Sequence, residues 1–226
     1  ALAAWTLRNS GYNYSGTSTT FTTPDATRFY LSNSDEQGNG GTTTTSLTSP
    51  AFSTLGISTA NINLSHYYRF NGTESAVVQA STDGSSWTTL QTYSSTQGGP
   101  SSFATPSISM NAFANPPVVY VRLKYDASFD YFWAINNVTV TGSAIYTYAW
   151  TTDNSAFTSS SASTTDNPTA NTIYSLAVSN VLGCSNSGTR SITVTPIAVV
   201  DAGSNMTTCG TTPFLFNSGA NTLNTT

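Results

Sequence analysis

Tyr131-Phe-Trp-Ala-Ile-Asn-Asn-Val-Thr-Val-Thr-Gly142 is the stretch that decides the fold class of this chain. It is rich in aromatic and β-branched residues, which lose side-chain freedom in a helix and pack well on a pleated sheet. It ends at a glycine, after which aromatic residues become sparser. The stretch therefore predicts a strand that closes one β-sandwich and leads into a second module.

Two further segments alternate between apolar and polar positions with a period of two, residues 62–70 and residues 118–125. In the second of them Val121 and Leu123 point to one face, and Arg122 and Lys124 point to the other. A shift of one residue would bury both cations, so the register of this strand is well specified. A helical period continues nowhere for more than a turn. The chain is predicted to be all-β.

Composition narrows the class of protein. Charged residues make up 7% of the 226 residues, against roughly 25% in an ordinary domain. The aromatic content of 12% argues against disorder. Six basic residues and a net charge of -4 exclude a stripe that binds nucleic-acid phosphates. There is no run of about 20 apolar residues that would cross a membrane. We interpret the chain as a secreted fragment with a neutral surface.

Turn residues and composition divide the chain into three parts. Asp83-Gly84 lies between two strand-like segments and predicts a hairpin, because both residues tolerate positive φ. One domain boundary is predicted near Gly142–Ser143 and a second near Pro196. The parts are therefore residues 1–142, residues 143–196 and residues 197–226.

The first part carries several motifs in a recognisable order. They are the polar loop Asn33–Gly40, the Ser-Pro strand Leu47–Phe52, the aromatic strand Leu64–Phe70, the hairpin Ser81–Leu90 with its Ser-x-Asp-Gly-x-x-Trp pattern, the strand 121–125 and the closing strand 131–142. With these motifs, residues 1–142 resemble the MAM-like jelly-roll modules that include the cleaved adhesin domains of Bacteroidetes surface proteases. The resemblance implies a jelly-roll β-sandwich in a secreted or cell-surface bacterial protein.

The resemblance also implies a structural calcium ion. The family usually closes with Trp-x-Ile-Asp-Asp-Val, whose acidic pair helps to hold the ion, whereas this chain has asparagines at both acidic positions. An asparagine carbonyl still ligates calcium, but without the charge that raises affinity. The candidate ligands are Asp35, Asn137, Asp25 and Asn33. In the alternative interpretation, Asp35 and its neighbours cap a turn and bind no metal.

Residues 143–196 resemble an immunoglobulin-like or PKD-like repeat, and residues 197–226 resemble the start of another. The repeat is short beside the roughly 100 residues of a full immunoglobulin domain. We expect a smaller Ig-like β-sandwich after the jelly roll, followed by an incomplete repeat. Cys184–Cys209 is the one disulfide that can form within the chain, and an oxidising extracellular environment favours it.

The residues that could perform catalysis are few. His66 is the only histidine, and the alternation places it on the apolar face of a strand, which favours a core histidine over a general base. The chain has no Gly-x-Ser-x-Gly elbow and no pair of histidines or cysteines at zinc spacing. Its only glutamates are Glu36 and Glu74. We predict that the segment is not an enzyme.

Binding is the favoured class of function. Tyr67, Trp87 and Tyr120 fall on faces opposite or beside the core positions, where exposed rings would stack on sugars. In the alternative, these rings pack the second sheet of the sandwich.

Three hypotheses follow. The first is a segment of an adhesin whose jelly roll binds a glycan or another surface, while the repeats form a stalk. The second is an accessory region of a secreted hydrolase. The third is a structural subunit that contacts identical neighbours in a filament or surface layer.

Overall fold

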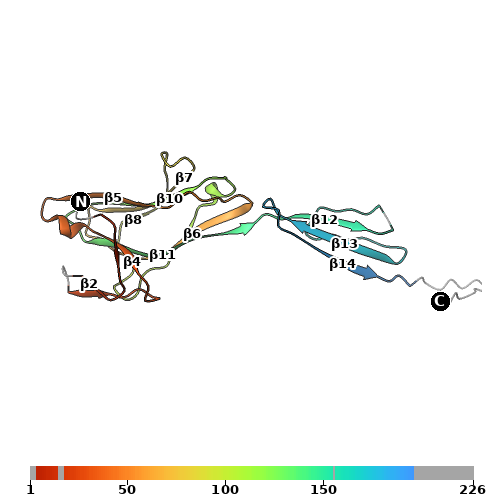
Figure 1. Cartoon of the computed structure of the whole chain (residues 1–226), viewed down its shortest axis with the longest axis horizontal. Helices are drawn as coiled ribbons and strands as arrows, with labels where there is room; N and C mark the ends of the chain where they lie inside the picture. Colours follow the sequence, from red (N-terminus) through yellow and green to blue (C-terminus); the bar gives the residue numbers. More distant parts are fainter. Residues whose placement is uncertain (1–3, 15–17, 155, 196–226) are drawn as a thin grey trace, which may run out of the picture.

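The computed structural model describes residues 4–14, 18–154 and 156–195. The chain is all-β, as predicted, and the described ranges contain two short 3-10 helices, Ser34–Gln37 and Asn111–Phe113. Figure 1 shows a larger sandwich followed by a slimmer three-stranded sheet. No helix of the described residues is long and apolar enough to cross a membrane.

Two antiparallel sheets form the sandwich. The first has five strands in the order β1 (Thr6–Arg8), β4 (Phe29–Asn33), β11 (Phe132–Ala144), β6 (Ile57–Arg69) and β9 (Ser107–Ser109). The second has four, in the order β5 (Thr42–Thr48), β10 (Tyr120–Ser128), β7 (Ser75–Ser81) and β8 (Thr88–Tyr93). A separate hairpin, β2 (Tyr12–Tyr14) with β3 (Thr19–Phe21), completes the domain. Neighbours in each sheet are often distant in sequence, so the prediction of a β-sandwich is confirmed.

The main core lies between the two sheets and centres on Trp133, which is fully buried. Its ring lies 5.8 Å from that of Trp5 and 6.2 Å from that of Tyr68. The alternation predicted for β10 is confirmed, since Val121 and Leu123 are buried in this core. Such alternating burial gives each strand a single favourable register.

A second aromatic cluster covers the opposite face of the five-stranded sheet. It is made of Tyr14, Phe21, Phe29, Leu31, Tyr67, Phe103, Phe132 and Ala134. The β2–β3 hairpin supplies Tyr14 and Phe21, whose rings stack 5.7 Å apart. The sheet is therefore buried on both faces at this end. Tyr67 is 7% exposed in the cluster, so its prediction as an exposed ligand-binding ring is wrong.

The Asp83-Gly84 turn joins β7 and β8, as the sequence predicts. The Asp83 carboxylate accepts hydrogen bonds from the backbone N–H groups of Ser85 and Ser86, each at 2.7 Å, and from Ser81 Oγ at 2.8 Å. These bonds stabilise the charged form and hold the pKa of Asp83 well below its usual range. Gly84 adopts a φ of 73°, which favours glycine.

The second module contains one antiparallel sheet among its described residues, in the order β12 (Thr147–Thr152), β13 (Thr172–Ser179) and β14 (Ser185–Ile192). The expected smaller sandwich is therefore represented by a single sheet in this part of the chain. Strand β11 runs to Ala144, two residues beyond Gly142, and the domain boundary there stays a prediction. Residues 197–226, the expected start of another repeat, lie outside the described residues.

The two modules meet at a short junction. The Ile145 N–H donates a 2.6 Å hydrogen bond to the Gly56 carbonyl. A Cβ atom built on Gly56 would lie 2.7 Å from Val181 Cγ2, in the turn between β13 and β14. This close approach places that turn against the end of the sandwich.

The first prediction concerns Gly142, where β11 and β6 lie so close that a Cβ atom would collide with Ile57 Cγ2 and the Thr59 carbonyl. We expect Gly142→Ala to lower the free energy of unfolding by about 1–3 kcal/mol, the usual cost of overpacking. Urea denaturation measures the change. Gly188→Ala is the control, because a Cβ atom there has no neighbour within 4 Å. Equal free energies of unfolding for the two variants would contradict the prediction, because β6 and β11 would then move apart around the added methyl group without loss of stability.

Candidate functional site

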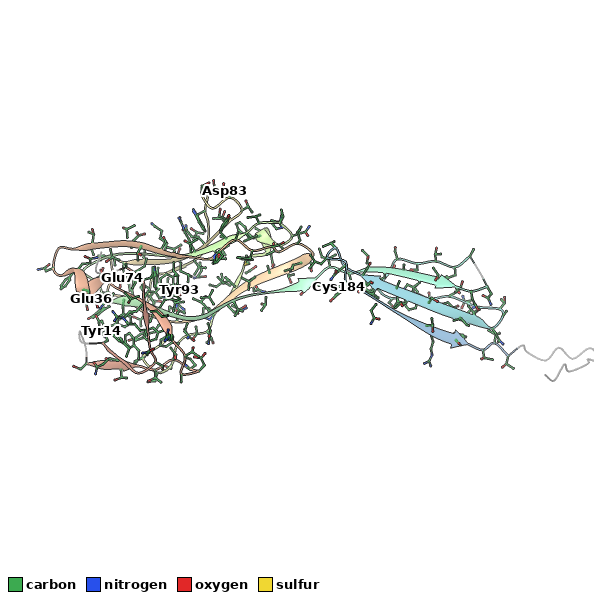
Figure 2. The ribbon with its side chains drawn as sticks, viewed as in Figure 1. Tyr14, Glu36, Glu74, Asp83, Tyr93 and Cys184 are labelled. Atoms are coloured by element: carbon green, nitrogen blue, oxygen red, sulfur yellow. The ribbon has the colours of Figure 1, made fainter. Side chains whose placement is uncertain are left out.

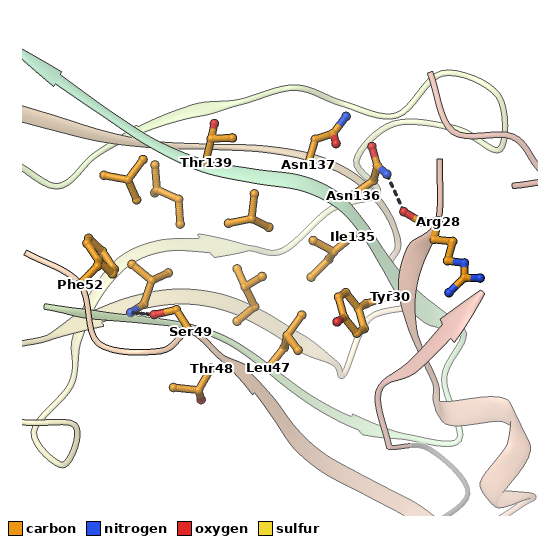
Figure 3. Close-up of a pocket in the computed structure, with 15 residues that line it drawn as sticks. Arg28, Tyr30, Leu47, Thr48, Ser49, Phe52, Ile135, Asn136, Asn137 and Thr139 are labelled. Atoms are coloured by element: carbon orange, nitrogen blue, oxygen red, sulfur yellow. Dashed lines mark hydrogen bonds between the residues drawn. The ribbon is translucent and has the colours of Figure 1, made fainter. Parts of the chain in front are cut away.

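A groove of about 480 Å³ lies between the two sheets (Figure 3). Its floor is made of core residues: Ile62, Val121, Leu123 and Ile135. Its walls are Tyr30, Leu47, Phe52, Val138 and Val140, which are half-buried or exposed. A mostly apolar trough of this size has the dimensions of a ligand site.

The groove exists because β4 is short. It pairs with β11 only over Phe132–Ile135, so from Asn136 onward the outer edge of β11 has no neighbouring strand among the described residues. The pairing of β11 with β6 is also irregular between Asn136 and Thr139, and Asn137 adopts a φ of 51°. Such a bulge bends a strand locally, here at the rim of the groove.

Polar groups gather at one end of the groove. The Asn136 side chain is buried and donates from Nδ2 to Thr27 Oγ1 at 2.9 Å and to the Arg28 carbonyl at 2.8 Å. Its Oδ1 atom is buried without a hydrogen-bond partner in the described structure. The exposed Arg28 guanidinium makes no ion pair with any described residue. The groove is thus apolar along most of its length, and this end carries the Arg28 cation beside Asn137, which bonds to the Asp25 carboxylate.

The four predicted calcium ligands lie in two separate pairs. In the first pair, Asn137 Nδ2 donates to Asp25 Oδ2 at 2.8 Å. Asp25 Oδ1 accepts from the N–H and the hydroxyl of Thr27, at 3.1 and 2.8 Å. The hydrogen bond from Asn137, with those from Thr27, lowers the pKa of Asp25 to about 2. This pair therefore closes a loop in which both oxygens of the Asp25 carboxylate accept hydrogen bonds.

The second pair is Asn33 and Asp35, at the other end of β4. Asn33 Nδ2 donates to Glu36 Oε1 at 3.2 Å, while Asn33 Oδ1 is buried without a described partner. Tyr14 donates its hydroxyl proton to Asp35 Oδ2. Asn33 pairs with Phe132, five positions from Asn137 along β11, or roughly 16 Å at the usual strand rise. The two pairs therefore cannot ligate one ion.

Among the described residues, no group of three or more histidine, cysteine, aspartate or glutamate side chains is arranged to hold a metal. The donor set that fits calcium best is Asn33 Oδ1 with the Asp35 carboxylate, because oxygen ligands suit this ion and one of them is unpartnered. Calcium binding stays a prediction.

Two buried carboxylates near this end went unnoticed as a pair in the sequence. Asp130 accepts hydrogen bonds from Asn71 Nδ2 at 3.2 Å, Thr73 Oγ1 at 2.9 Å and the Ser128 N–H at 3.2 Å. Glu74 accepts from the N–H groups of Asn71 and Thr73. Buried charges need such donors. Asp130 thus ties the loop before β7 to the loop before β11, and Glu74 stabilises the first of these loops, consistent with a capping role.

His66 is buried in the main core, as the sequence predicts. Its Nδ1 atom accepts a 3.1 Å hydrogen bond from Trp133 Nε1, and its ring lies 4.6 Å from that of Tyr93. Burial disfavours the charged imidazolium and lowers the pKa of His66 to about 4. A buried, neutral imidazole that accepts from an indole is a structural group.

The other two predicted binding rings, Trp87 and Tyr120, are half-buried at the end of the four-stranded sheet where the β7–β8 turn lies. The Arg122 guanidinium lies over the Trp87 ring, 4.2 Å from its centroid, and Arg122 Nε donates to Gln79 Oε1 at 2.7 Å. Tyr120 lies beside Gly84. The structure thus brings Trp87 and Tyr120 to one region, away from Tyr67.

Cys184 is exposed at the start of β14. Cys209 lies outside the described residues, so the disulfide stays a prediction. The side chains at the groove's end, Arg28 and Asn136, did not stand out in the sequence, because no local pattern marks a gap beside a short strand.

No protein-family model matches this chain, and no curated protein does. A solved structure, the K1 cleaved adhesin domain of Lys-gingipain from Porphyromonas gingivalis, is similar with a TM-score of 0.44 and 14% sequence identity. The similarity covers 63% of this chain and 85% of that one. At this identity and TM-score the likeness decides neither fold nor function.

The second prediction tests calcium. We expect calcium to raise the melting temperature of the protein relative to a chelator, because a ligand that binds only the folded state stabilises it. Asp35→Asn should abolish this shift, whereas Asp25→Asn, the matched change at the other end of β4, should preserve it. Differential scanning fluorimetry measures both. An unchanged melting temperature in the wild-type chain would contradict a structural calcium ion.

The third prediction follows from the pKa of His66. The unfolded imidazole titrates near 6.5 and the folded one near 4, so protonation favours the unfolded state between these values. The contribution of the neutral His66 to the free energy of unfolding is fully present above pH 6.5. It is lost as the pH falls toward 4, by up to about 1.4 kcal/mol per pH unit. Urea denaturation across this range measures the loss. His66→Gln, which keeps an acceptor but does not titrate, should flatten the slope between pH 7 and pH 5; an unaltered slope would contradict this assignment.

Proposed function

We propose that this chain is a noncatalytic segment of a secreted or cell-surface bacterial adhesin. The sandwich binds a glycan on the outer face of its four-stranded sheet, and the β12–β14 module belongs to a stalk. The observation that carries the proposal is the aromatic and polar surface around Trp87, Arg122 and Tyr120.

The strand register defines this outer face. Arg122 on β10 lies between Thr48 on β5 and Gln79 on β7, and Gln79 pairs in turn with Thr89 on β8. The next row on the same face has Lys124 between Ser46 and Val77, because side chains two residues apart point the same way. Apart from Val77, this face beside Trp87 is therefore polar, with hydroxyls, an amide and two cations, of which Lys124 pairs with Asp126.

This chemistry suits a polyhydroxylated ligand. Aromatic rings contact the apolar C–H face of a sugar, while hydroxyl, amide and guanidinium groups bond to its rim. Arg122 stacks on Trp87 and bonds to Gln79, so the groups are held in place before a ligand arrives. Pre-ordered side chains lower the entropic cost of binding.

The noncatalytic role is supported by the position of His66, the only histidine and thus the one side chain whose usual pKa suits a base at neutral pH. His66 is buried against Trp133 and has no access to a substrate on the surface. The stalk role is supported by the continuity of the chain, because β11 ends at Ala144 and β12 begins at Thr147 (Figure 1).

The fourth prediction addresses the glycan. We expect the protein to bind glycans on an array, and Trp87→Ala to weaken binding at least tenfold, because both the ring and the support for Arg122 are lost. Tyr146→Ala is the control, since this exposed ring lies at the junction between the modules. Isothermal titration with the best glycan measures the ratio. Absence of any glycan binder, or equal effects of the two variants, would contradict the proposal.

A further inference from the structure

The groove between the sheets is a gap of the size of one strand. Strand β4 begins at Phe29 and pairs with β11 only to Ile135, so the next stretch of β11 offers its outer edge without a neighbouring strand in the described structure. Open strand edges pair readily with an extended segment. The gap lies directly over core residues, since Ile62 and Ile135 form its floor.

The rim of the groove is unusually apolar for a surface. Val138, within the irregular part of β11, is 43% exposed, and Tyr30 on β4 is 42% exposed. Figure 3 shows Leu47 and Phe52 on the side of the second sheet, facing the β11 residues across the groove. Exposed apolar surface of this kind marks an interaction site. A strand laid here would bury side chains against an existing core.

The charge at one end defines what the strand must carry. Arg28 lines the groove beside Asn136, and within the described residues its guanidinium has no acidic partner. A carboxylate at the corresponding end of the incoming strand would pair with it. The site therefore favours a strand that presents two apolar residues on one face. The following position on the same face should be acidic, so that it meets Arg28.

The chain itself contains such a segment, Ile197-Ala-Val-Val-Asp201. In an extended conformation Ile197, Val199 and Asp201 share one face, because side chains alternate along a strand. The segment spans four residue steps, about 13 Å, which equals the length of β11 from Asn136 to Val140. Residues 197–201 lie outside the described residues, so the match rests on their sequence and on the geometry of the groove.

We propose that residues 197–201 of a second copy of this chain bind in the groove as an added strand, antiparallel to β11. Ile197 then lies near Val140, Val199 enters the apolar trough, and Asp201 pairs with Arg28. The occupant comes from another copy because of distance. Strand β14 starts at the junction and ends seven residues further along the chain, at Ile192, about 23 Å away. The five steps from Ile192 to Ile197 reach at most about 18 Å, too short to return to the groove.

Such a contact joins different surfaces of two identical chains. A head-to-tail contact of this kind propagates from copy to copy and forms open assemblies. This inference supports the third hypothesis, in which the modules contact identical neighbours in a filament. It does not depend on the proposed glycan surface, which lies on the outer face of the other sheet.

The fifth prediction tests the added strand by charge reversal. We expect the full chain to self-associate with increasing concentration in sedimentation velocity experiments. Arg28→Asp and Asp201→Arg should each raise the dissociation constant at least tenfold, because each places like charges together. An equimolar mixture of the two variants should regain association, since each groove then meets an opposite charge.

Lys124→Asp is the control, because it reverses a charge on the outer face of the four-stranded sheet and should leave association unchanged. Circular dichroism melting checks that every variant is folded. Trp87→Ala should leave association unchanged, and Arg28→Asp should leave glycan binding unchanged, which separates this proposal from the previous one. The proposal is overturned if the chain stays monomeric at all concentrations. The same holds if the groove binds a different peptide while the chain stays monomeric. Association that resists Arg28→Asp, or a mixture that fails to associate, also overturns it.

Discussion

Phe132 and Trp133 are neighbours on β11 and point to opposite faces of the five-stranded sheet, and both are almost fully buried. Trp133 fills the core between the two sheets, whereas Phe132 packs under the β2–β3 hairpin with Tyr67 and Phe21. One strand thus anchors two apolar layers, and the order of strands around it follows from covering both of its faces. The buried histidine, the second aromatic cluster and the position of the groove all depend on this double burial.

The same strand changes character along its length. Up to Asn136 its side chains are buried, and beyond that point they become exposed or half-buried. The β2–β3 hairpin, which carries Tyr14 (labelled in Figure 2), packs against Phe132 in the first half of the strand. The exposed half forms one wall of the groove and then leads through Gly142 to the junction with the second module. Strand β11 thus belongs to the core in its first half and lines the groove in its second half.

Much of the fold could be predicted from local patterns. The alternation in β6 and β10, the Asp83-Gly84 hairpin and the all-β class each reflect side-chain chemistry within a few residues. The candidate site was less accessible. Tyr67 alternates like a surface residue, yet a hairpin far away in sequence covers it. The four proposed calcium ligands all carry side-chain oxygens, which suit the ion. Strand β4, however, separates them into two pairs.

The sequence by itself determined the strand periodicity, the low-charge surface, the burial of His66 and the scarcity of catalytic groups, because these depend on residue type and spacing. Only the tertiary structure decided which faces are covered twice, where β11 loses its neighbour and which polar groups meet. Those outcomes depend on the length of β4 and on contacts between segments as distant as Arg28 and Asn136. Contacts between distant segments leave no local pattern, so the groove and the cation at its end became visible only in the folded chain.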